Sequence, residues 1–380
     1  MKLKTMDKLN LAAEHNLMDI ENAKASGRKV IGFYCLYSPM ELAVAADAIP
    51  VPLCGTRNEP IDSAEEFLPR SLCPLIKSSF GFAATDACPY FRYSDIVIGD
   101  TTCDGKKKMF ELLAGYRPMH ILQLPQNPDS EKALLFWRDE IEAFKCVLEK
   151  TTGNEINNEN LAAAIQLMNL ERMTKKELMD LAKTKPAPIS GIDLLTMMFR
   201  TGFFADKIKG IALVNDIIIE IKENALRGES AFSISTPRIL LTGVPVGIGS
   251  DKVVRILEES GANVVCFENC SGYKQAYTVD EVKEPLLALA EQYLSIPCSV
   301  MSPNDGRFAL LSEMISEFSV DGVVDLTWQG CHTYNVEAYS VEKFVKKKHG
   351  LPYLHLETDY SESDTGQLKI RVEAFLEMIG

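Results

Sequence analysis

The stretch YSDIVIGDTTCDGKKKMFELLAGYRPMHILQLP, residues 93–125, changes from strand to helix and back to strand. The apolar run at residues 96–98 predicts a buried strand, and a second strand-like run begins at residue 119. Between them, residues 106–114 place apolar side chains at helical spacing. Two strands joined by a helix favour a parallel pair, because a parallel connection must cross over the sheet. This stretch therefore predicts an α/β fold.

The same alternation occurs on both sides of a long helical region. Strand-like runs precede the opening stretch at residues 29–38 and 50–54, and four more follow residue 236 at 238–243, 262–269, 321–328 and 351–360. Between about residue 129 and residue 230 only helical periodicity is found. We expect an N-terminal α/β domain at 1–128, a helical segment at 129–235 and a C-terminal α/β domain at 236–380.

Composition and charge narrow the function classes. The 380 residues carry a net charge of −13, which argues against nucleic acid and against anionic membrane surfaces. No run of 18 apolar residues occurs, and the charged start MKLKTMDKLN does not resemble a secretory signal. We therefore expect a cytoplasmic protein, in which ten cysteines are more typical of metal binding or catalysis than of disulfides.

Six of the ten cysteines occur at positions that favour ligand binding. Four follow predicted strands, at the sheet edge where open α/β folds bind ligands: Cys54, Cys103, Cys270 and Cys331. Cys73 and Cys88 lie in a loop-rich segment, and each is followed by proline, which stiffens the chain beside the sulfur. We expect the other four to be packing residues, with Cys35 inside a strand, Cys146 on an apolar helix face, Cys266 in mid-strand and Cys298 ambiguous.

The spacing of these cysteines favours an iron–sulfur cluster over zinc. Zinc sites pair their cysteines closely, whereas here single cysteines are separated by long segments. Thiolates dispersed in this way suit an iron–sulfur cluster held between two domains. Glu268 and His332 are the candidate catalytic residues, because Glu268 shares a strand face with Cys270 and His332 adjoins Cys331, from where it could donate to a cluster sulfur or to substrate. Of the lysines at 106–108, at least two are expected on a solvated helix face.

Six motifs together resemble the 2-hydroxyacyl-CoA dehydratase and benzoyl-CoA reductase family. They are LCPLIKSSFG, DACPYF, DTTCDGKKKMFELL, FENCSGYK, GCHTYNVE and the ending LETDYSESDTGQLKIRVEAFLEM. Within that family the chain is most similar to the double-cubane cluster proteins. The resemblance implies two flavodoxin-like parallel-sheet domains with an intervening helical segment and a cluster in the cleft.

The resemblance also implies a ligand set and partners. Cys88, Cys103 and Cys331 match the cysteines of a shared [4Fe–4S] cubane, and a double-cubane [8Fe–9S] unit needs three more. Cys73 and Cys270 fit, and Cys54 is chosen as the sixth ahead of Cys298 and Cys266. The family implies a homodimer, served by a separate ATP-hydrolysing iron–sulfur activator. The apolar segment LLTMMFRTGFF, residues 194–204, is a candidate for the dimer interface.

These observations predict an oxygen-sensitive iron–sulfur reductase that passes low-potential electrons to a small substrate. One alternative is a 2-hydroxyacyl-CoA dehydratase subunit with a single [4Fe–4S] cluster, and another is an electron carrier without its own substrate. A zinc-containing or metal-free α/β protein is the remaining alternative. The chain has no Walker-type phosphate loop and no dinucleotide fingerprint, so ATP hydrolysis is assigned to the partner.

Overall fold

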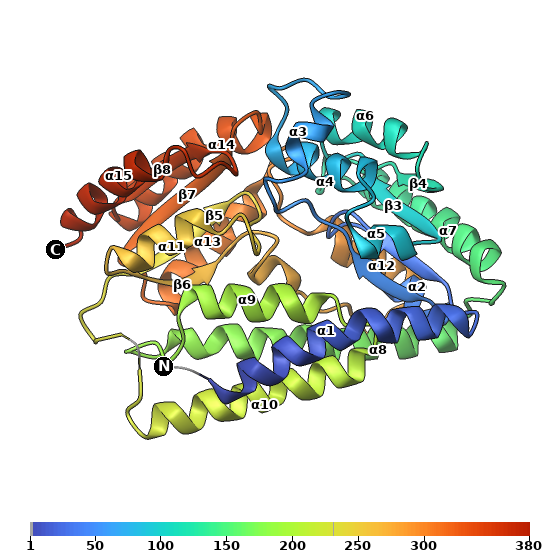
Figure 1. Ribbon diagram of the computed structural model, residues 1–380, viewed down its shortest axis with the longest axis horizontal. Coiled ribbons are helices and arrows are strands. Elements are labelled where there is room, and N and C mark those ends of the chain that lie inside the picture. Colours follow the sequence, from blue (N-terminus) through green and yellow to red (C-terminus); the bar gives the residue numbers. More distant parts are fainter. Residues whose placement is uncertain (1–2, 231) are drawn as a thin grey trace.

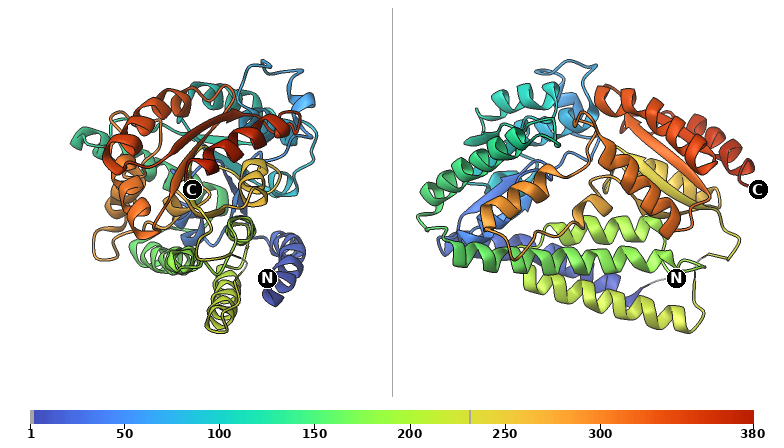
Figure 2. Two further views of the ribbon diagram at one scale, coloured as in Figure 1. Left: turned by 90° about the vertical axis from the view of Figure 1, so that its left-hand side faces the viewer. Right: turned by 180° about the vertical axis from the view of Figure 1, so that it is seen from behind.

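The computed structural model describes residues 3–230 and 232–380 (Figure 1). Two four-stranded parallel sheets lie above a layer of long helices, and this arrangement is visible from both sides of the molecule (Figure 2). The expected α/β class with two flavodoxin-like parallel sheets is confirmed. In the described part of the chain, no helix is both long and apolar enough to cross a membrane.

The first sheet has the strand order β2-β1-β3-β4. Its strands are β1 (Val30–Phe33), β2 (Ile49–Pro52), β3 (Ile96–Asp100) and β4 (Met119–Leu122). All three pairings are parallel. β1 and β3 are buried along their whole length, as expected for central strands that are covered by helices on both faces.

Short helices and one long helix surround this sheet. They are α2 (Glu41–Ala45), α3 (Ile61–Ala64), α4 (Pro74–Ala84), α5 (Pro89–Tyr93), α6 (Asp104–Leu113) and α7 (Glu131–Thr152). Proline occupies the first position of α4 and of α5, where its missing N–H costs nothing. α7 packs against β4 and also against α12 (Pro285–Leu294), which comes from the C-terminal part of the chain.

The second sheet repeats the order of the first as β6-β5-β7-β8. Its strands are β5 (Arg238–Gly243), β6 (Asn263–Phe267), β7 (Gly322–Trp328) and β8 (Tyr353–Thr358). Its helices are α11 (Lys252–Glu259), α13 (Asp305–Glu317), α14 (His332–Phe344), which continues as a π-helical turn at Val345–His349, and α15 (Thr365–Glu377). Corresponding strands therefore occupy the same relative positions in the two sheets.

Four long helices form the layer beneath both sheets in Figures 1 and 2: α1 (Lys4–Ala25), α8 (Asn158–Asp180), α9 (Gly191–Gly202) and α10 (Lys207–Leu226). The side chains of Asn157, Ser190 and Asp206 cap the starts of α8, α9 and α10. α8 packs against α2, whereas α9 packs against β6, so the layer supports both sheets.

Loops at the carboxyl ends of the two sheets contact each other directly. Tyr360, which follows β8, donates a hydrogen bond of 2.8 Å to the carbonyl of Gly55, which follows β2. Thr56 in turn donates to the carbonyl of Ile248 at 2.9 Å. Because parallel sheets bind ligands at this edge, the contacts place two ligand-binding edges opposite each other.

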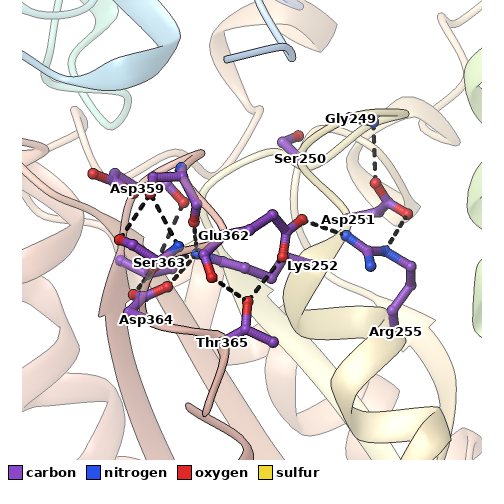
Figure 3. A network of polar contacts seen from close by, with 12 residues as sticks. Gly249, Ser250, Asp251, Lys252, Arg255, Asp359, Glu362, Ser363, Asp364 and Thr365 are labelled. Carbon is purple, nitrogen blue, oxygen red and sulfur yellow. Dashed lines mark hydrogen bonds and ion pairs between the residues drawn. The ribbon is translucent and has the colours of Figure 1, made fainter. Parts of the chain in front are cut away.

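A buried lysine fixes two of these loops to each other (Figure 3). The ammonium of Lys252, at the start of α11, donates to Thr358 at 2.9 Å and to Asp364 at 2.5 Å. Arg255, one turn later, pairs with Glu362 at 2.7 Å on the exposed side of the same network. The loops after β5 and β8 are thus held by one buried and one exposed ion pair.

Three local expectations are wrong. The first strand ends at Phe33, so Cys35 lies in the loop after β1 and not inside a strand. Cys146 is exposed, because the apolar face of α7 is formed by other residues. The apolar side chains of residues 194–198 are largely buried inside this chain, so their character is explained by packing of α9 and not by a dimer interface.

Candidate functional site

Two cysteines follow equivalent strands of the two sheets. β1 and β3 are neighbouring central strands, and the chain leaves them toward opposite edges of the sheet; the same holds for β5 and β7. Such a change of direction creates a crevice at the carboxyl edge of a parallel sheet. Cys103 lies just beyond β3, and Cys331 lies just beyond β7. Both are the N-cap residues of the helices that follow, so their placement after strands is confirmed.

A second pair of cysteines shows the same equivalence. Cys54 follows β2, and Cys270 follows β6, which are corresponding edge strands of the two sheets. Both line the central cavity described below. Cys54 is exposed, whereas desolvation raises the pKa of the Cys270 thiol to about 12, an effect that Lys274 opposes.

Cys73 and Cys331 come from different sheets and lie next to each other. The interaction between their thiols lowers the pKa of Cys73, against the effect of burial, and raises that of Cys331. Gly330 makes this approach possible, because it adopts φ +74° and a Cβ there would overlap the carbonyl oxygen of Ser71. Only glycine adopts this conformation without strain and leaves room for the neighbouring backbone.

Backbone amides surround these thiols because the cysteines begin helices. Cys73, Cys103 and Cys331 are the N-cap residues of α4, α6 and α14. The free N–H groups of a first helical turn favour negative charge. Cys88 likewise precedes the short helix α5, and its sulfur accepts from the amide of Phe91 at 3.5 Å.

A cavity of about 280 Å³ lies between the sheet edges and the helical layer. Cys35, Cys54 and Cys270 line it from the loops after β1, β2 and β6. Among the residues that the structure describes, five cations also line it, namely Lys106, Arg172, Lys175, Lys207 and Lys274, against a single carboxylate, Glu171. Its lining is therefore suited to an anionic occupant.

Lys106 is the lysine of the KKK run that faces this cavity. Its ammonium donates to the carbonyl of Tyr34 at 2.9 Å and lies 3.5 Å from the buried carboxylate of Asp100. Burial alone would lower the pKa of Lys106, but the charge of Asp100 outweighs it and raises the pKa. Lys107 and Lys108 are 46% and 67% exposed, so the expectation that at least two lysines are solvated is confirmed.

Glu268 lies in a fully buried charge network beside the cavity and does not line it. Its carboxylate is 2.8 Å from the ammonium of Lys274 and 3.4 Å from the Arg307 guanidinium. These cations lower the pKa of Glu268 despite its burial. Lys274 is the member of this network that reaches the cavity, whereas His332 is exposed at the start of α14.

Several cavity residues lie outside the predicted set. Cys35 was missed because the first strand ends early, and the cations of α8 and α10 were missed because helical lysines ordinarily face solvent. Cys298 is buried and lies 3.8 Å from the hydroxyl of Tyr334, within the same charge network as Lys274. Cys266 is buried within β6, as expected.

The residues present fit an iron–sulfur cluster. Cys73, Cys331 and Cys103 influence one another's pKa values, and helix starts supply amides next to all three. Within residues 3–230 and 232–380, no three His, Cys, Asp or Glu side chains are close enough to hold one metal ion. The thiolates around a cluster bind different irons, so they need not meet at a single ion.

Comparison with known proteins gives the family. The model of the 2-hydroxyglutaryl-CoA dehydratase D-component matches residues 35–379. The chain therefore belongs to the 2-hydroxyacyl-CoA dehydratase family. YjiM of Escherichia coli K12, whose name as a dehydratase subunit is provisional, is 42% identical over 98% of this chain and 97% of its own length.

More distant relatives have more specific names. The (R)-phenyllactyl-CoA dehydratase beta subunit of Clostridium sporogenes is 26% identical over 95% of this chain and 94% of its own length. The lactoyl-CoA dehydratase subunit beta of Anaerotignum propionicum is 25% identical over 93% of this chain and 92% of its own length. These matches extend the similarity across both sheets and the helical layer.

Proposed function

We propose that this chain holds a double-cubane [8Fe–9S] cluster between its two sheets and acts as a reductase component for a small substrate. One observation carries the proposal. At the facing edges of the two sheets, cysteines follow corresponding strands in pairs, Cys54 with Cys270 and Cys103 with Cys331. A single cubane held by three cysteines would leave at least one of these pairs incomplete.

Six cysteines are the proposed ligands: Cys54, Cys73, Cys88, Cys103, Cys270 and Cys331. When bound, an iron–sulfur cluster supplies single electrons at low potential. The residues of this chain would tune the potential of the cluster, offset its charge and exclude water. The amides that begin α4, α6 and α14 are available to bond the cluster's sulfur atoms and so to tune its potential.

Charge and water exclusion are the other contributions of the chain. Lys106 and Lys274 line the cavity from its two sides and offset negative charge there. Phe33, Phe199 and Phe203 line the cavity as well and limit the entry of water. The cavity of about 280 Å³ lies near the lower end of the roughly 300–1,000 Å³ range of ligand sites and is large enough for a small substrate.

Electrons come, in this proposal, from a separate iron–sulfur ATPase, as the family resemblance implies. The sequence has no phosphate-binding loop of its own to couple ATP hydrolysis to electron transfer. We further propose a homodimer, closed by two-fold symmetry, the commonest arrangement of identical chains.

A dehydratase subunit is the second candidate, because curated relatives are named as dehydratase beta subunits. In that case Cys88, Cys103 and Cys331, which match the cysteines of the family's shared cubane, would hold one [4Fe–4S] cluster, and a different subunit would complete the enzyme. An acyl-CoA substrate would then place only its acyl end in a cavity of about 280 Å³.

Iron and sulfide analysis of the anaerobically purified chain separates these proposals. About eight irons per chain, with matching sulfide, are expected for a double cubane. Four irons per chain would overturn it in favour of the dehydratase subunit, and zinc alone would overturn both. Substrate reduction that proceeds equally without MgATP or without the ATPase partner would overturn the proposed electron supply.

A further inference from the structure

Two buried lysines on the helical side of the cavity share one carboxylate. The ammonium groups of Lys175 on α8 and Lys207 on α10 lie 3.0 Å and 3.4 Å from the same oxygen, Oε1 of Glu171. All three residues are more than nine-tenths buried, and all three line the cavity. In the described part of the chain, neither ammonium has another hydrogen-bond or ion-pair partner.

The neighbouring charges do not balance this group. Arg172, which also lines the cavity, forms its ion pair with Glu41 on α2, at 2.5 Å. Three cations therefore face two carboxylates, and one positive charge remains. A buried charge without a counter-ion is costly, and burial lowers the pKa of Lys207 for this reason.

The surroundings indicate the kind of counter-ion that would fit. The cavity measures about 280 Å³, and Met168, Met198 and Phe199 line it from the same helical side as the lysines. One unbalanced charge matches a monoanion, and apolar neighbours match a short hydrocarbon group. A carboxylate accepts from two ammonium groups at once, one on each oxygen.

We propose that Lys175 and Lys207 form a binding position for a small carboxylate monoanion, on the helical wall of the cavity and opposite the cysteine loops. The position does not depend on how many irons the chain holds. Its failure can therefore be told apart from failure of the proposed cluster.

A purely structural ion-pair cluster makes the opposite prediction for one variant. Lys207→Met removes the surplus charge and leaves Lys175 paired with Glu171. If the lysines form a binding position, the variant melts no lower than the parent in buffer without carboxylate, but it loses stabilisation by carboxylate. If they are only structural, removal of one lysine lowers the melting temperature and changes no response to carboxylate.

The matched control is Lys222→Met. Lys222 on α10 pairs with Glu177 on α8 at 2.7 Å, so it joins the same two helices, but both side chains are about half exposed. The probes are acetate and its neutral analogue acetamide. A ligand that binds the folded state raises the melting temperature as its concentration rises.

The experiment uses the full anaerobically purified chain, with its iron and after iron removal. We expect acetate but not acetamide to raise the melting temperature of the parent and of Lys222→Met in both forms. For Lys207→Met, calorimetry should show at least a tenfold weaker acetate affinity. Equal acetate responses in all three proteins, or none in the parent, would overturn the proposal. A response confined to the iron-free form would also overturn it, because the lysines would then balance the charge of the cluster.

Discussion

The thiols of Cys73 and Cys331 lie close enough to shift each other's pKa, although Cys73 precedes α4 beside the first sheet and Cys331 follows β7 of the second. The contact depends on the close approach of the two backbones at Gly330. A ligand held by both thiols would therefore be sensitive to small displacements of either loop.

Replacement of Gly330 tests this geometry without removing a thiol. Gly330→Ala should lower the iron content of the purified chain, because the added methyl group would overlap Ser71 and lie 3.1 Å from the amide of Cys73. Gly228→Ala is the matched control, since Gly228 has the same φ of +74° but no atom within 4 Å of the added Cβ. Both variants carry about 1–2 kcal/mol of left-handed backbone strain. Equal iron contents would show that loop spacing is unimportant.

Direct removal of a thiol gives a second test. Cys103→Ala should remove or shrink the cluster, because it strips a thiolate from an iron in the proposed site. Cys146→Ala should leave iron content and stability nearly unchanged, since Cys146 is exposed on α7 and surface changes have effects within about 0.5 kcal/mol. Iron and sulfide analysis of the two variants provides the measurement. A cluster retained in full by Cys103→Ala would exclude this cysteine as a ligand.

Glu171 should make the chain sensitive to acid. Lys175 and Lys207 outweigh the effect of burial and lower the pKa of Glu171 from its usual 4.5 to about 2. The stabilisation from this carboxylate is therefore complete above pH 4.5 and is lost as the pH falls toward 2, by on the order of 3 kcal/mol. Denaturant unfolding at a series of pH values should show a stability difference between parent and Glu171→Gln that shrinks in this range.

The exposed Glu177 provides the control for that measurement. Its pair with Lys222 is about half exposed, and exposed ion pairs contribute less than about 1 kcal/mol. Glu177→Gln should therefore follow the parent closely across the same pH range. A constant difference between the parent and Glu171→Gln down to pH 2 would contradict the role of the two lysines.

The loop network of Figure 3 predicts unequal effects for its two basic residues. Lys252→Met should destabilise the chain by about 1–3 kcal/mol, because it removes the buried donor shared by Thr358 and Asp364. Arg255→Met should cost less than about 1 kcal/mol, since its pair with Glu362 is exposed. Unfolding in denaturant measures both effects, and similar losses for the two variants would contradict this account.

The strand–helix alternation of the sequence was sufficient to predict both parallel sheets. The alternation is local, because each buried strand of an α/β fold is an apolar run with turn residues at its ends. For the same reason the cysteines at 54, 103, 270 and 331 were correctly placed after strands. The end of the first strand was not predicted, because the apolar run of the sequence continues through Tyr34 and Cys35, which lie in the loop after β1.

For a different reason, the sequence alone could not predict which lysines face the cavity. Lys175 and Lys207 lie on helices whose sequences also contain solvent-facing lysines such as Lys222. Which lysine faces inward depends on how α8 and α10 pack beneath the sheets, and that is a tertiary property. Glu268 was predicted near the cleft, but its burial with Arg307 depends on α13, which is distant in sequence.

The contact between Cys73 and Cys331 has a consequence for biosynthesis. A ribosome produces the first sheet and its cysteines long before it produces β7, so a nascent chain would lack part of the proposed ligand set until its last quarter has emerged. Until then Cys54, Cys73, Cys88 and Cys103 are available to oxidants and to stray metal ions. If the chain holds the proposed cluster, the complete cluster would form only after Cys331 has been synthesised, and a carrier that delivers iron and sulfide would then have to recognise the nearly complete chain.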